Sequence, residues 1–233
     1  MSKLVWDAVG ERFYETGTKK GVLYPMANNA YPTGVAWNGL TAFSASPDGG
    51  EATDIWADDI KYLTLRSTEN FKGTIEAYTY PDEFAECDGS AWIVPGAKIG
   101  QQTRKTFGFS FVSTKGNDTL NDAYGYIIHL IWGATAAPSE KSYSTINDSP
   151  EAITFSWEIS TIPVDVGTVN GTTYKPFAHM EIDSSKFTSQ EDKAKLTALE
   201  EALYGTDGAG GKTAHLPLPA AVIAILTTGT EPA

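Results

Sequence analysis

Four carboxylates that lie close together in the sequence, beside aromatic residues, are the strongest candidate for chemistry. The carboxylates are Glu76, Asp82, Glu83 and Glu86, with Tyr78, Tyr80 and Trp92 nearby. Two such carboxyl groups can catalyse glycoside hydrolysis when one is protonated and the other is ionised. However, 29 of the 233 residues are Asp or Glu, so clusters of this size arise by chance. A glycosidase is therefore kept only as a third hypothesis, and we expect the chain not to be an enzyme.

The other residue types that support catalysis or metal binding are sparse. The three histidines are scattered along the sequence: His129, His179 and His215. His129 lies in an apolar stretch and is interpreted as a core residue. No metalloprotease, nucleophile-elbow or phosphate-loop pattern is present. A calcium site could be built from three residues with oxygen ligands, Asp118, Asn121 and Asp122, but their spacing is not that of an EF-hand loop. The single cysteine, Cys87, excludes an internal disulfide. The sequence therefore predicts no catalytic residue, no metal site and no cofactor.

The charge of the chain is strongly acidic. Lys and Arg number 17 against 29 Asp and Glu, which gives a net charge of −12. A protein that holds nucleic acid needs a basic face, so stable binding of nucleic acid is disfavoured. Two stretches, 48–59 and 73–97, contain acids and no base. These stretches are interpreted as solvated loops or as a surface that repels anions.

Membrane insertion and secretion are also disfavoured by the sequence. The longest apolar stretch, Ala220–Leu226, is far shorter than the ~20 residues needed to cross a bilayer. The first dozen residues carry acids and no long apolar run, which is not typical of a secretory signal.

Alternating side chains in the middle of the chain predict strands of a β-rich fold. Arg104–Ser113 and Glu151–Ser160 each place aromatic or aliphatic residues on one face and small or polar residues on the other. Ala123–Trp132 is apolar on both sides, as expected for a central strand covered on both faces. Weaker strands are expected at Arg12–Thr16, Gly34–Phe43, Ile60–Leu65, Gly73–Tyr80 and Phe177–Ile182.

One amphipathic helix is predicted over about 190–204. Ser189 is a candidate N-cap, Asp192 stands where a capping box has its acid, and Gly205 is a stop signal. Three leucines form an apolar stripe: Leu196, Leu199 and Leu203. We expect one β-domain over 1–205, with a helical turn at Pro81–Cys87. A C-terminal linker and extension follows over 206–233, where Pro219–Leu226 is a short helix or a final strand.

A long segment of about 44–59 has no strand or helix signal and is predicted to be a protruding loop. Ile55 and Trp56 lie within it between acidic residues. Large apolar side chains in a hydrophilic segment either fold back on the body or are reserved for a partner, and both interpretations stay open.

Several strings, in order and over nearly the whole chain, resemble a bacteriophage major tail protein, the tail-tube subunit of phages with long, non-contractile tails. The strings are WDAVGERFYETG (6–17), GVLYP (21–25), YPTGVAWNGL (31–40), IEAYTYPDEFAECDGS (75–90), GATAAPSEKSYSTINDSPEAITFSWEIST (133–161), LEEALYGT (199–206) and HLPLP (215–219). The resemblance implies an antiparallel β-sandwich or half-barrel with one flanking helix and a long protruding loop.

The resemblance also implies a structural role in the virion. Six subunits form a ring, and rings stack into a hollow tube for DNA ejection into the host. The partners are then other copies of the chain and the tape-measure, tail-terminator and distal tail proteins, with DNA only as transient cargo. The expected location is the virion tail, after synthesis and assembly in the host cytoplasm.

Within this framework, polar positions of the predicted strands are expected to line the tube. Glu158, Glu76 and Glu181 are predicted to face the lumen; the alternative is that they face bulk solvent outside. Asp54, Ile55 and Trp56 are predicted to dock on the neighbouring ring as part of the loop.

A binding module is the competing class of function. In a carbohydrate-binding β-sandwich or adhesin, exposed aromatic rings stack on sugars. The candidate rings are those of exposed tyrosines and of Trp6, Trp37, Trp56 and Trp92.

Overall fold

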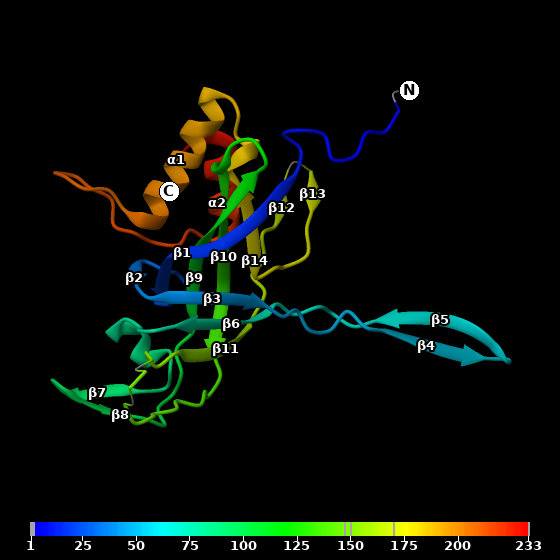
Figure 1. The fold of residues 1–233 in the computed structure, drawn as a ribbon. Helices are drawn as coiled ribbons and strands as arrows, with labels where there is room; N and C mark the ends of the chain where they lie inside the picture. The colour runs from blue at the N-terminus through cyan, green and yellow to red at the C-terminus, as the bar shows by residue number, and fades with distance from the viewer. Residues whose placement is uncertain (1–2, 147, 150, 170, 233) are drawn as a thin grey trace.

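A curled antiparallel sheet of eight strands forms the body of the protein in a computed structural model, which describes residues 3–146, 148–149, 151–169 and 171–232. The strand order is β2-β1-β9-β10-β11-β6-β3, and β14 also pairs with β10 (Figure 1). The strands are β1 (Phe13–Pro25), β2 (Val35–Trp37), β3 (Leu40–Ala45), β6 (Lys72–Ala77), β9 (Phe107–Asn117), β10 (Asn121–Ala136), β11 (Phe155–Thr161) and β14 (His179–Asp183).

The remaining elements are short hairpins and helices around this sheet. The hairpins are β4–β5 (Ala52–Ala57 and Ile60–Arg66), β7–β8 (Ala91–Val94 and Ala97–Ile99) and β12–β13 (Thr168–Val169 and Thr172–Thr173). The 3₁₀ helices are η1 (Asp82–Glu86) and η2 (Ser184–Lys186), and the α-helices are α1 (Gln190–Tyr204) and α2 (Pro219–Thr228). The predicted class, a mainly antiparallel β fold with helical additions, is confirmed.

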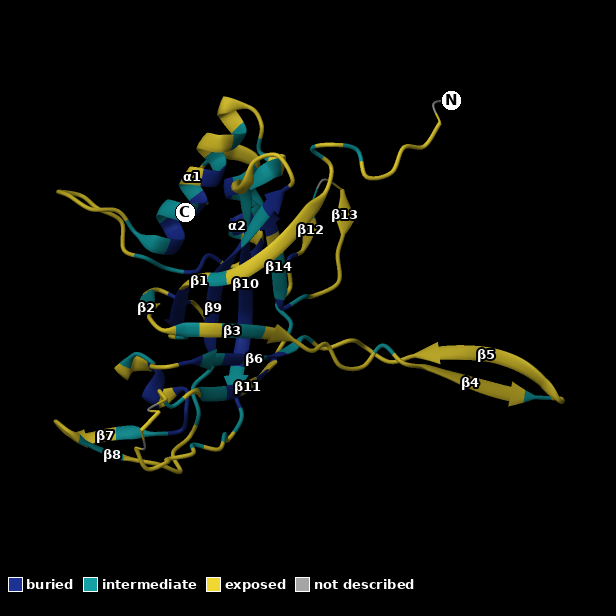
Figure 2. Cartoon of the chain, in the orientation of Figure 1, coloured by how far each residue is buried: buried dark blue, intermediate teal, exposed yellow. Residues whose placement is uncertain are grey.

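Two hydrophobic cores lie on opposite sides of the sheet. One core joins the sheet to α1 and α2 through residues such as Ile128, Trp132 and Leu199. The other is rich in aromatic rings and lies inside the curl of the sheet, with Phe109 and Trp157 at its centre. Figure 2 shows this buried centre and, by contrast, the exposed hairpins around it.

The two faces of β10 are buried, as predicted, but the prediction for β9 was wrong in one respect. Gly108 and Ser110, on the expected polar face of β9, are buried because Tyr24, Tyr31 and Leu216 of the helix-side core cover that face. The Ser110 hydroxyl lies 3.1 Å from the hydroxyl of Tyr24, so the buried polar group is satisfied.

Gly133 marks the point at which β10 changes its neighbour. Ile131 pairs with His179 of β14, whereas Ala134 pairs with Thr161 of β11. Gly133 has a φ of +64°, and a Cβ there would lie 2.3 Å from the carbonyl oxygen of Ile162. A side chain is therefore excluded at this bend.

The helix predicted over 190–204 is confirmed as α1. The Ser189 hydroxyl accepts from the Asp192 N–H at 3.0 Å and donates to the Asp192 carboxylate at 2.7 Å. The predicted turn at Pro81–Cys87 is η1. The short helix that begins at Pro219 is α2, and the alternative of a final strand was wrong.

The stretch after Gly205 contributes to the body. Leu216, Val222 and Ile225 belong to the same core as Leu199, so the core continues across the boundary expected at residue 205.

Candidate functional site

A two-stranded arm, β4–β5, projects far from the body (Figure 1). The two strands are joined by Asp58 and Asp59, both with positive φ, as in the two-residue turns that suit hairpins. The ladder continues toward the body, since Asp48 and Asn70 exchange both backbone hydrogen bonds at 2.9 and 2.7 Å. The arm is therefore a continuation of β3 and β6.

The structure corrects the expected loop of 44–59. Ser44 and Ala45 are the last two residues of β3, residues 52–57 form β4, and the irregular part of the expected loop is the connection between these strands and the turn after β4. The predicted strand Ile60–Leu65 exists as β5, but it pairs with β4 in the arm and not with the sheet of the body. Periodicity predicted that strand correctly, but it carries no information about which strand is its partner.

Apolar side chains are exposed along the arm. Ile55 and Leu63 are directly paired, so they lie on one face, and Leu65 follows on the same face of β5. Their exposures are 39%, 38% and 55%. Further exposed rings and chains of the arm are Trp56, Ile60 and Tyr62. Sequence reasoning identified Ile55 and Trp56, but it missed the residues of β5 because it ended the protruding segment at residue 59 and predicted Ile60–Leu65 only as a strand.

Asp54 is held within the arm. Its carboxylate lies 2.7 Å from Lys61 Nζ and accepts a 2.8 Å hydrogen bond from the Thr64 hydroxyl. The hydrogen bond from Lys61, followed by that from Thr64, lowers the pKa of Asp54. Asp54 thus connects the two strands of the arm, whereas Ile55 and Trp56 remain available to a partner.

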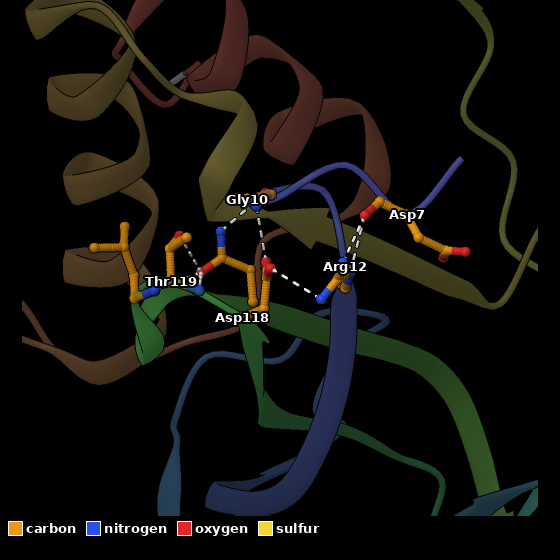
Figure 3. A network of polar contacts seen from close by, with 7 residues as sticks. Asp7, Gly10, Arg12, Asp118 and Thr119 are labelled. Atoms are coloured by element: carbon orange, nitrogen blue, oxygen red, sulfur yellow. Dashed lines mark hydrogen bonds and ion pairs between the residues drawn. The ribbon is translucent and has the colours of Figure 1, made fainter. Parts of the chain in front are cut away.

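A polar network fixes the base of the N-terminal segment to the turn between β9 and β10 (Figure 3). The Asp118 carboxylate accepts from the Gly10 N–H at 3.0 Å and lies 3.9 Å from the Arg12 guanidinium. Arg12 also donates to the Asp7 carbonyl at 2.8 and 3.0 Å. The Asp118 carboxylate is therefore occupied by donors of the chain itself.

Beyond this network, the N-terminal segment carries a second set of exposed apolar residues: Leu4, Val5, Trp6 and Val9. The segment extends away from the body at the edge of the molecule (Figure 1). Two separate extensions thus present apolar side chains to water.

Two of the three acids expected in a lumen share one face of the sheet. Glu76 pairs with Ser156 and Glu158 pairs with Thr74 across β6 and β11. Their neighbours in sequence, Ile75 and Trp157, point into the aromatic core, so the two carboxylates lie on the outer face. Neither acid has an ion-pair partner within the described ranges of the chain. Lys72, which lies on the same face of β6 as Glu76, is paired with Asp48.

Glu181 is not brought together with those acids. It pairs with His129 across β14 and β10, on the side of the sheet that faces the aromatic core. His179 lies beside it, so two of the three scattered histidines meet in space. Desolvation by burial lowers the pKa of His129, and burial also lowers the pKa of His179 to about 4. Both imidazoles are therefore neutral near pH 7.

The aromatic residues considered for sugar binding are dispersed. Trp37 is 3% exposed and packs against Phe84 and Trp157 in the core. Trp56 belongs to the arm and Trp92 to β7, two elements at opposite extremes of the molecule (Figure 1). Trp6 lies in the N-terminal segment.

The carboxylates considered for glycoside hydrolysis lie on two different elements. Glu76 is on the outer face of β6, whereas Asp82, Glu83 and Glu86 belong to η1. Glu86 forms a 2.9 Å ion pair with Lys105.

No protein-family profile matches the chain, and no curated protein matches it either. Among the described residues, neither helix has the length and apolar character needed to cross a bilayer.

Proposed function

We propose that the chain is a tail-tube subunit of a phage with a long, non-contractile tail. In this proposal six copies form a ring and rings stack into a conduit for DNA. The resemblance of the ordered sequence strings supports the proposal, and the β4–β5 arm is the structural observation that carries it.

The arm requires a partner for physical reasons. A two-stranded hairpin alone is at best marginally stable in water. Here both strands are exposed apart from the half-buried Ala57, and one face presents Ile55, Leu63 and Leu65. Contiguous exposed apolar residues mark interaction surfaces. We infer that the arm of each subunit lies on a copy in the neighbouring ring, a head-to-tail contact that continues along the tube axis.

The body offers strand edges for contacts within a ring. Within the described ranges, β3 hydrogen-bonds as a strand only to β6, and β14 only to β10. Unpaired strand edges attract other strands unless they are covered. Neighbouring copies joined at such edges would continue the sheet around a ring and remove the edges.

The charge is consistent with a conduit that does not retain DNA. Six copies at −12 give a ring of about −72 before ion binding. We propose that Glu76 and Glu158 face the lumen, because they lie together on one polar face of the sheet. Glu181 is left out of this proposal because it lies on the other side of the sheet, with the histidines. Carboxylates cannot replace the counterions of phosphates, so DNA passes as cargo.

The tape-measure, tail-terminator and distal tail proteins are the further partners, and the virion tail is the proposed location.

Deletion of the arm tests this function. A variant in which residues 51–66 are removed keeps the whole body, so we expect a folded monomer that does not polymerise. The matched control is the double variant Asp58→Asn, Asp59→Gly, which suits the positive φ values of the turn and keeps the arm. Sedimentation velocity over increasing concentration measures the outcome. Assemblies of normal size from the deleted variant would contradict the role of the arm, and a monomeric wild type under all conditions would contradict the function itself.

A further inference from the structure

Two histidines and a glutamate converge in a pocket of about 270 Å³ between β1, β3, β9, β10 and β14. His129 Nδ1 lies 3.4 Å from His179 Nε2 and 3.7 Å from Glu181 Oε1, and His179 Nε2 lies 3.9 Å from the same oxygen. One ligand atom from each residue thus points to a common centre, with all three atoms within 4.8 Å of one another.

The backbone and the core hold these side chains in place. His129 and Glu181 are directly paired across β10 and β14, and His179 lies two residues before Glu181 on the same face of β14. Phe111 stacks on the His129 ring at 4.4 Å between centroids, and Phe71 stacks on His179 at 4.5 Å. The two imidazoles are therefore carried on strands and held by packing, as a preorganised site requires, whereas Glu181 is placed by the register of β14.

We propose that His129, His179 and Glu181 bind a divalent transition-metal ion such as Zn²⁺. Two imidazole nitrogens at ~2.0–2.1 Å from a tetrahedral zinc are separated by about 3.3–3.4 Å. The observed 3.4 Å fits that spacing, whereas it exceeds the usual ~2.7–3.2 Å range of an N–H hydrogen bond. The distances to Glu181 are longer, so this exposed side chain would have to turn toward the two imidazoles to complete the site.

The surroundings of His129 match those of a metal ligand. Its second nitrogen, Nε2, lies 3.0 Å from the Ser113 hydroxyl. When Nε2–H donates to that hydroxyl, the lone pair of Nδ1 faces His179, and such a partner on the second nitrogen is characteristic of ligating histidines. Glu15 also lines the pocket. Its carboxylate, or a water molecule in the pocket, would then be the fourth ligand of the metal ion.

The ligand types select the class of metal. Imidazole suits zinc, nickel, cobalt and copper, whereas calcium and magnesium prefer sites made of oxygen ligands. An ion at this site would add a side-chain link between β14 and β10, which are joined here by backbone pairing. This inference does not depend on the proposed tail-tube function.

Isothermal titration of ZnCl₂ into the full, untagged chain, after removal of metal with EDTA, tests the site. We expect one zinc per chain, and a loss of affinity of at least tenfold in His179→Ala and in Glu181→Gln, with MgCl₂ giving no binding. The matched control is His215→Ala, since His215 faces a single carboxylate, Glu231 at 2.9 Å, and zinc binding should be unchanged there.

Circular dichroism verifies that each variant is folded. Glu181→Gln changes only an exposed side chain, so it decides the result if His179→Ala does not fold. If the wild type binds no zinc at zinc concentrations up to roughly 1 mM, the proposal is overturned. Equal affinity in Glu181→Gln and wild type would overturn the assignment of the carboxylate ligand.

Discussion

In the proposed assembly, Leu63 is expected to matter little for folding and much for the contact between copies. It is 38% exposed on the apolar face of the arm, opposite Ile55. We expect Leu63→Ser to change the free energy of unfolding of the monomer by no more than about 0.5 kcal/mol. Loss of a leucine buried against a second copy costs about 1.5–3 kcal/mol, so assembly should weaken by roughly tenfold or more.

The control for Leu63→Ser is its neighbour on the opposite face of β5. Thr64→Ser keeps the hydroxyl that donates to Asp54 at 2.8 Å, so both folding and assembly should be unchanged. Chemical denaturation and sedimentation velocity measure the two properties separately. Equal assembly of Leu63→Ser and wild type would show that the apolar face of the arm is not an interface.

Asp183 gives the stability a defined pH dependence. Burial raises the pKa of this carboxyl, but hydrogen bonds from Lys115 and Ser185 outweigh burial and hold the pKa below its usual value. A carboxylate with a lowered folded pKa stabilises the protein above its unfolded pKa of ~3.9, and that stabilisation is lost as the pH falls through the folded value.

In Asp183→Asn this contribution is absent. We therefore expect the variant to be less stable than wild type at neutral pH, and the difference to shrink as the pH falls below the ordinary aspartate range. Urea unfolding at a series of pH values measures the difference. A gap between the two proteins that stays constant down to the most acidic pH would contradict this role of the ion pair.

At the scale of elements, Tyr24 connects β1 to the end of α1. Its hydroxyl donates to the Leu203 carbonyl at 2.9 Å and lies 3.1 Å from Ser110 Oγ, and burial raises its pKa. Tyr24→Phe leaves a buried carbonyl unpaired, which costs about 1–3 kcal/mol. Urea denaturation should show this loss, and Tyr62→Phe, a matched change on the exposed arm, should show none. A Tyr24→Phe protein as stable as wild type would mean that this hydrogen bond does not contribute to holding α1 on the sheet.

Elements with strong local signals could be predicted from the sequence. Ser189 and the leucine stripe define α1, and the continuous apolar residues of Ala123–Trp132 define a covered strand, because capping and periodicity act between near neighbours. The arm was not predicted as a hairpin. Exposed Ile55 and Leu63 resemble core residues in sequence. No local feature of the sequence distinguishes such exposed apolar residues from buried ones.

The histidine cluster was also beyond the reach of sequence reasoning. His129 and His179 are 50 residues apart and meet only through the register of β10 against β14. That register depends on the packing of the whole sheet, including the change of partner at Gly133. Spacing along the chain therefore contains no signal for this pair.

At the scale of the whole molecule, the body and its extensions have different physical roles. The two cores stabilise one curled sheet and its helices, and they account for nearly all the large buried side chains. The arm and the N-terminal segment carry apolar residues that this body does not cover. Uncovered extensions on a complete core are what the proposed assembly of copies would use, and the net charge of −12 would be multiplied in each proposed ring.

Electron microscopy of the concentrated, purified chain tests the self-assembly most directly. The account predicts stacked six-membered rings around an open channel, with the arm of each subunit lying on the adjacent ring and Glu158 on the channel wall. Single subunits at every concentration and salt condition, or tubes with Glu158 on the outer surface, would contradict it.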